Sequence, residues 1–109
     1  MFKYNLFLLT KLPSAWFSGV RVRSVKEDKC IVDVKLKWFN QNPFKSMFWA
    51  VQGMAAELST GIPIIHEVNN RKIKVSMLVT SNSSKFYKKA VGRIKFECNQ
   101  FNDVRKVFN

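Results

Sequence analysis

The sequence predicts a single α+β domain in which one long apolar helix packs against an antiparallel sheet. Apolar residues recur with helical spacing between residues 44 and 58, and they alternate with charged residues in the segments before and after. The length of 109 residues leaves room for one domain, residues 1–109, with a usable core. Hydrophobic residues make up 47% of the chain, which excludes a disordered protein.

The chain starts with a short apolar segment, which we expect to form an amphipathic helix that ends before Pro13. This apolar run is shorter than the roughly 18 residues that a membrane-spanning helix needs. No clear small-residue cleavage site follows it, as one would after a secretory leader. We therefore expect a cytoplasmic protein without a membrane span.

Alternation of apolar and charged residues with period two predicts strands on both sides of the helix. The first two are expected to form a hairpin, because the polar turn Glu27-Asp28-Lys29 separates them. A polar bend at residues 81–84 is expected before the last strand. The four expected strands cover residues 20–23, 30–38, 73–79 and 94–98.

The central helix is expected to begin at Pro43, after a cluster of helix-breaking residues, and to end near residues 61–63. Pro43 suits a first helical turn, and Asn42 can cap the helix by accepting a bond from a free backbone N–H. After Lys45, Glu57 is the one charged residue in this helix. Such a helix should be buried on nearly all sides, as a curled sheet would bury it.

The net charge of +12 raises the question of an anionic partner. Most of the basic residues in the expected strands fall at outward positions, so we interpret the charge first as a solvated face. The charge supports a nucleic-acid-binding module as a third interpretation of the function. Exposed aromatics interleaved with Lys and Arg, which would be a second line of support, are not evident in the sequence. The sequence contains no metal cluster, phosphate loop or nucleotide fingerprint, so no metal and no cofactor are expected.

The two cysteines, Cys30 and Cys98, lie far apart in the sequence and lack the spacing of metal ligands. We expect two reduced thiols in the core and no disulfide.

Four short stretches carry a resemblance to a known family. They are Lys-Leu-Pro at residues 11–13, Gly-Val-Arg-Val at 19–22, Asn-Gln-Asn-Pro-Phe at 40–44 and Met-Ala-Ala-Glu-Leu-Ser-Thr-Gly at 54–61. Together they resemble an uncharacterised bacterial hotdog-fold family, similar to the acyl-CoA thioesterases of the phenylacetate-degradation type. The resemblance implies a hotdog fold, in which a curved antiparallel sheet wraps one long central helix.

The resemblance extends from about residue 12 to residue 100. The family's domain continues into further strands that complete the sheet. This chain is therefore either a truncated form of that domain, missing its last strands, or it uses residues 101–109 for something the family does not.

In those thioesterases an Asn, a Gly, a His-Gly-Gly at the helix start and an acid two turns further on make the active site. Asn42 and Glu57 match the Asn and the acid, whereas Lys45 replaces the Gly and residues 48–50 replace the His-Gly-Gly. The resemblance implies that Glu57 is a general base for water or a nucleophile, and that Asn42 orients the carbonyl or the water. Alternatively, Glu57 satisfies donors from a neighbouring strand and Asn42 only caps the helix.

Substrate contacts are expected along the same helix. Phe48 and Trp49 line an acyl tunnel or, in the interpretation we favour, fill the core. Gln52 lies one turn before Glu57 and either shares the site or has no role in it. The phosphate groups of coenzyme A would attract lysines near the tunnel mouth, although ordinary surface charge explains them as well. The candidates are Lys45, Lys88 and Lys89.

The resemblance also implies a homodimer or tetramer in which Glu57 of one chain faces the helix start of the other, where backbone N–H groups at residues 43–47 polarise the thioester carbonyl. His66 is expected in a polar, solvated loop, so no Ser-His or Cys-His mechanism is expected. The first predicted function is hydrolysis of acyl thioesters. The alternative is a non-catalytic protein that binds acyl chains or acyl-CoA.

Overall fold

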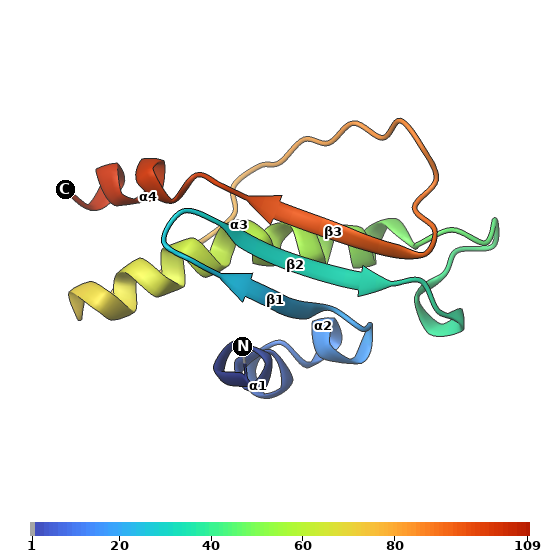
Figure 1. Cartoon of the computed structure of the whole chain (residues 1–109), viewed down its shortest axis with the longest axis horizontal. Helices are drawn as coiled ribbons and strands as arrows, with labels where there is room; N and C mark the ends of the chain where they lie inside the picture. The colour runs from blue at the N-terminus through green and yellow to red at the C-terminus, as the bar shows by residue number, and fades with distance from the viewer. Residues whose placement is uncertain (1) are drawn as a thin grey trace.

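The computed structural model describes residues 2–109 and shows one long helix packed against a three-stranded antiparallel sheet (Figure 1). The expected α+β class is therefore confirmed. The elements, in chain order, are α1 (Phe2–Lys11), α2 (Pro13–Phe17), β1 (Arg21–Val25), β2 (Cys30–Lys35), the 3₁₀ helix η1 (Trp38–Asn40), α3 (Trp49–Arg71), β3 (Arg93–Cys98) and α4 (Phe101–Phe108).

The sheet has the order β1-β2-β3, with β2 in the centre. The expected β1–β2 hairpin forms, and β3 pairs with the other edge of β2 so that Cys98 lies opposite Cys30. Both cysteines are buried and free, as expected. Two thiols far apart in the sequence thus become cross-strand neighbours, because the chain returns through α3 before it forms β3.

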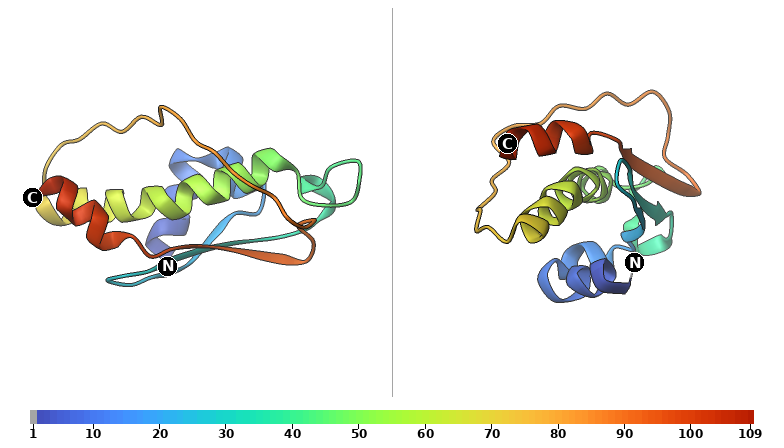
Figure 2. Two further views of the ribbon diagram at one scale, coloured as in Figure 1. Left: turned by 90° about the horizontal axis from the view of Figure 1, so that it is seen from above. Right: turned by 60° about the vertical axis from the view of Figure 1, so that its left-hand side comes forward.

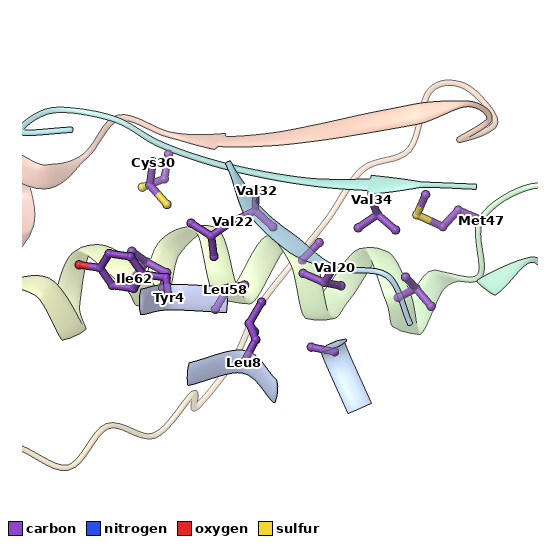
Figure 3. Packing of buried hydrophobic residues seen from close by; sticks show 14 of the residues in the cluster. Tyr4, Leu8, Val20, Val22, Cys30, Val32, Val34, Met47, Leu58 and Ile62 are labelled. Atoms are coloured by element: carbon purple, nitrogen blue, oxygen red, sulfur yellow. The ribbon is translucent and has the colours of Figure 1, made fainter. Parts of the chain in front are cut away.

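The core lies between the inner face of the sheet and one face of α3. Figure 3 shows Val22 and Val32 of the sheet facing Leu58 and Ile62 of α3, with Leu8 of α1 on the far side of the helix. Apolar residues at helical spacing place one stripe of α3 on the sheet, and alternation places one face of each strand against it. Figure 2 shows α1 and α2 beside this layered core, and α4 near the C-terminal end of α3.

The bounds expected for the central helix are wrong at both ends. It begins at Trp49 instead of Pro43, and it continues to Arg71 through Gly61 and Pro63, which are both buried. A proline inside a helix costs about 3 kcal/mol relative to alanine, which is why the sequence predicted an end there. Burial of neighbouring side chains such as Ile62 in the core outweighs this cost.

Asn42 does not cap the central helix as expected. Its side-chain oxygen accepts bonds from the backbone N–H groups of Phe44 and Ser46, at 2.9 and 3.2 Å, inside the turn that precedes α3. The residue before α3 is Phe48, whose side chain caps nothing.

Three strands form in the described residues instead of the expected four, because residues 72–92 contain no strand. Figure 2 shows this segment leaving the end of α3 and running back over the helix to β3. Its apolar side chains, including Ile73, Val75 and Met77, are exposed. Alternation makes a segment competent to form a strand, but a strand also needs a neighbour for its backbone hydrogen bonds. No element among residues 2–109 supplies one here.

β2 also ends earlier than predicted, at Lys35, and Trp38 lies in η1 with its side chain exposed. Asn40 explains this end. Its buried side chain accepts a bond from the backbone N–H of Lys37 at 2.7 Å and donates to the carbonyl oxygens of Ser18 and Lys35, both at 3.0 Å. Asn40 thereby ties the link before β1 to the end of β2.

We predict that Asn40→Ala lowers the free energy of unfolding by about 1–3 kcal/mol, because it leaves buried backbone groups without partners. Denaturant unfolding measures the change. The matched control is Asn42→Ala, whose side chain is only half-buried and whose bonds stay within one turn, and we expect its effect to be about 1 kcal/mol or less. Equal losses in both variants would contradict the role assigned to Asn40.

The pKa of the Cys30 thiol is raised to about 12, chiefly by burial and further by the neighbouring Cys98. The thiol therefore stays protonated and unreactive at neutral pH. A raised folded-state pKa means that its contribution to stability is complete below the ordinary pKa of 9.0 and is lost as the pH rises towards 12.

We expect the native protein to react slowly with a thiol reagent at about pH 8 and both cysteines to react once it is unfolded. We also expect the free energy of unfolding to fall as the pH rises above about 9. Rapid labelling of the folded protein, checked by circular dichroism, would contradict the burial of this pair.

Candidate functional site

A cavity of about 500 Å³ lies along the side of α3 that faces away from the sheet. Trp49, Gly53 and Glu57 of α3 line one wall, and Val79 with residues 81–84 lines the other. These helix residues recur every four positions, so they share one face of α3. The cavity exists because the segment after α3 runs back over this face without packing closely on it.

A second cavity, of about 440 Å³, lies between α3 and the α1–α2 region. Its walls are mostly apolar and include Leu12, Ala15 and Ile65. Met54 and Glu57 border both cavities. The carboxylate of Glu57 is therefore the one acidic group that borders the two cavities along α3.

Glu57 is exposed and makes no ion pair with any other residue in the described part of the chain. The expectation that the helix is buried nearly all round is therefore wrong, because the side of α3 that carries Glu57 is left exposed between the elements that pack on its other sides. No donor from a strand satisfies Glu57, which removes the structural alternative considered for it. The carboxylate of Glu57 thus meets solvent at the border of the two cavities.

The start of α3 borders the same cavity through Trp49 and Ala50. The first backbone N–H groups of a helix have no partner within it, and they point towards the helix's positive dipole end. These groups belong to α3 from Trp49 onwards, and the expected position at residues 43–47 is wrong because those residues form a turn. From Trp49 to Glu57 the axis rises by about 12 Å, too far for both to act on one carbonyl within one chain.

The structure does not bring Asn42 to this site. Asn42 borders neither cavity with Glu57, and its amide donates to the Ser46 hydroxyl at 3.0 Å. The two residues that match the thioesterase motif are thus separate within one chain.

Phe48 and Trp49 are 51% and 55% exposed, so the prediction that they fill the core is wrong. Trp49 instead forms part of the cavity wall. Gln52 donates to the carbonyl oxygen of Met47 at 3.0 Å, which holds the chain entering α3.

The three lysines proposed for phosphate lie at the end of the molecule where α3 begins. Lys45 occupies the turn before α3, with a left-handed φ of 62°. Lys89 places its ammonium 3.5 Å from the carbonyl oxygen of Phe44 in that turn, and Lys88 is exposed beside it. None of the three borders the cavity that holds Glu57.

His66 lies inside α3 and not in the solvated loop that was expected. The Tyr4 hydroxyl lies 3.1 Å from its Nδ1 and the Asn70 amide 3.2 Å from its Nε2. Its ring also meets the edge of the Phe101 ring, with the centroids 6.2 Å apart. His66 therefore joins α1, α3 and the start of α4, and it lines neither of the two cavities that Glu57 borders. Among residues 2–109 no group of His, Cys, Asp or Glu has the arrangement of a metal site.

The sequence reasoning missed a charged cluster on the outer face of the sheet. Asp33 is buried beneath two arginines: Arg23 Nε lies 2.8 and 2.9 Å from its two carboxylate oxygens, and Arg93 Nη1 lies 3.2 Å from one of them. A single acid among the basic outward positions of the hairpin was the available signal. Alternation alone predicted that Asp33 is solvated.

We predict that Asp33→Asn lowers the free energy of unfolding by about 1–3 kcal/mol, because it leaves the two arginines close together without their shared carboxylate. The expected loss of stability is modest because both arginine side chains are about half exposed, so that solvent screens their charges. Asp28→Asn in the β1–β2 turn is the matched control, and we expect almost no change. A control that is as destabilised as Asp33→Asn would contradict the importance of the cluster.

No protein-family model matches this chain, and no curated protein matches it. A solved structure does: a protein of unknown function from Chlorobaculum tepidum TLS, with a TM-score of 0.80 and 24% identity. The match covers 89% of this chain and 59% of that chain. The likeness shows a shared fold, and this chain spans less than two thirds of its neighbour's length. No helix among residues 2–109 combines the length and hydrophobicity that crossing a bilayer requires.

Proposed function

We propose that this chain is a hotdog-type, thioesterase-like protein that binds acyl thioesters and hydrolyses them with Glu57. One observation carries the proposal: Glu57 borders both of the largely apolar cavities along α3 and has no partner of its own. Ligand sites are commonly apolar cavities of this size with a few polar groups. An acyl chain would occupy the apolar walls while the thioester lies beside the carboxylate.

The arrangement of elements supports the hotdog part of this proposal. A long helix follows a hairpin and packs on the inner face of an antiparallel sheet, and the strand after it joins the far edge of that hairpin. Further strands beyond β3 would be needed to wrap α3, whose outer side is open here.

In the proposed reaction the Glu57 carboxylate accepts a proton from water as the water oxygen attacks the thioester carbonyl carbon. The tetrahedral intermediate then collapses, its C–S bond breaks, and the thiolate that leaves takes the proton from Glu57, so that the products are the free thiol and the carboxylic acid. The oxygen of the intermediate needs donors, and the first N–H groups of α3 are suited to this role. Because these lie about 12 Å from Glu57 along the axis, the proposal includes a second copy whose helix start faces Glu57.

Asn42 acts in this proposal as a positioning residue. Its bonds to Phe44, Ser46 and the Ser46 hydroxyl hold the turn that leads into α3. Lys45, Lys88 and Lys89, at the same end, would attract the phosphates of coenzyme A. Trp49 would contact the acyl chain.

The second candidate is a protein that binds acyl chains or acyl-CoA without hydrolysing them. Two observations favour it: Glu57 is exposed to solvent, and Phe48-Trp49-Ala50 stand where the thioesterases have His-Gly-Gly. In this case Glu57 would contribute only to ligand orientation.

We predict that the native protein releases free thiol from at least one member of a panel of short and long acyl-CoA esters. Glu57→Gln should reduce turnover by about 100-fold or more, because it removes the base but keeps the shape. Glu27→Gln in the exposed β1–β2 turn is the matched control and should leave turnover unchanged.

Circular dichroism checks that both variants fold, and calorimetry measures acyl-CoA binding separately. Binding without turnover would support the second candidate. If the folded protein shows no binding and no turnover, both candidate functions are rejected.

A further inference from the structure

Large aromatic side chains are exposed at the end of the molecule where β2 gives way to η1. Trp38 is 82% exposed, Phe44 75% and Phe17 71%. They come from three separate pieces of chain: η1, the turn before α3 and the end of α2. Figure 1 shows η1 and the turn before α3 at one end of the elongated molecule and α2 further in, and the end of α2 approaches η1 because Phe17 and Phe39 border one hollow. Exposed aromatics gathered in one place mark an interaction surface more often than single exposed residues do.

Basic side chains surround these aromatics. Phe17 and Phe39 border a hollow of about 280 Å³ together with Arg21, Lys35 and Lys37. The guanidinium of Arg21 lies 3.5 Å from the centroid of the Trp16 ring and is thereby held in place. Burial, and after it the charge of Arg23, lower the pKa of Arg21, while Asp33 acts in the opposite direction.

On the other side of the same end, the turn before α3 carries Lys45, and Lys89 reaches the Phe44 carbonyl oxygen. Cations therefore lie on both sides of the exposed aromatics.

Carboxylates are missing from this end. The sequence contains no Asp or Glu between Asp33 and Glu57, and none between Glu67 and Glu97. Asp33 is already held by two arginines. The acidic Glu27 lies in the β1–β2 turn and Asp103 in α4, and Figure 1 shows both elements at the opposite end. The charge of the molecule is thus unequal along its 45 Å length.

We propose that this basic aromatic end, formed by η1, the turn before α3 and the end of α2, binds the surface of an anionic lipid bilayer. Trp and Phe side chains insert into the headgroup region, while Lys and Arg contact lipid phosphates and acidic headgroups. The unequal charge turns this end towards the membrane. The inference does not depend on the proposed hydrolysis, because the aromatics lie on projecting turns and not in the cavity of Glu57.

The arrangement favours a membrane over single-stranded nucleic acid. Proteins that bind single strands place aromatics along a basic groove, where successive bases stack on them. Here Trp38 and Phe44, the two most exposed aromatics of the set, do not line the basic hollow that Phe17 and Phe39 border. They lie on short segments at one end of the molecule, which suits contact with a broad surface. The sequence showed no exposed aromatics interleaved with Lys and Arg. In the folded protein such aromatics do occur, because the fold brings separate segments together.

The test is sedimentation with lipid vesicles of phosphatidylcholine alone and of phosphatidylcholine containing roughly a third phosphatidylserine. We expect binding to the anionic vesicles only, weakening as salt is added. In a Trp16→Phe, Trp49→Phe background, the emission of Trp38 should shift to shorter wavelength when vesicles are added.

Two variants and a matched control sharpen the test. Trp38→Ala combined with Phe44→Ala, and separately Lys37→Glu combined with Lys45→Glu, should each weaken vesicle binding by about tenfold or more. The control, Val107→Ala with Lys106→Glu, changes an exposed apolar and a basic residue in α4 at the opposite end and should bind as the native protein does. Circular dichroism establishes that each variant is folded.

Four outcomes would overturn the proposal. They are absence of binding to anionic vesicles by the native protein, equal loss in the control, binding of a single-stranded oligonucleotide without binding of vesicles, and self-association that shields Trp38 without lipid. Light scattering without lipid detects self-association and so distinguishes it from binding to vesicles. Acyl-CoA turnover without vesicle binding would leave the proposed function intact and reject only this inference.

Discussion

The buried side chain of Asn40 is the constraint on which the placement of α3 depends. Its amide must find partners inside the protein, because a buried polar group without them is costly. The side-chain amide finds them in the backbone groups of Ser18, Lys35 and Lys37. In addition, the backbone carbonyl oxygen of Asn40 accepts a bond from the backbone N–H of Phe48 at 2.9 Å. These four bonds join the end of β2, at Lys35, to the residue before α3, and α3 then lies over the inner face of the sheet.

Because α3 is placed this way, its two sides have different surroundings. The side with Val51 and Leu58 packs on the sheet and contributes to the core, while the side with Gly53 and Glu57 faces the two cavities. The outer face of the sheet is basic for a related reason: alternation that turns apolar residues inward turns Lys and Arg outward. The apolar site along α3 and the basic aromatic end therefore follow from one packing arrangement.

The sequence by itself determined the elements that depend on local pattern. The α+β class, the first helix ending before Pro13, the β1–β2 hairpin and the strand ending at Cys98 were all predicted and are confirmed. The free, buried state of Cys30 was predicted as well. Each of these depends on periodicity, turn residues or the preference of a small side chain for the core, which neighbours in sequence are sufficient to express.

The tertiary structure alone decided what depends on distant partners. Pro63 is tolerated within α3 because its neighbours are buried, and residues 73–79 form no strand because no neighbouring strand reaches them. Asp33 is buried because Arg93 arrives from a distant part of the chain, and Glu57 is exposed because the segment that runs back over that side of α3 does not pack closely on it. Hydrophobic periodicity and secondary-structure propensity indicate on which face of a helix or strand a residue lies. The groups that pack against that face come from segments far away in the sequence.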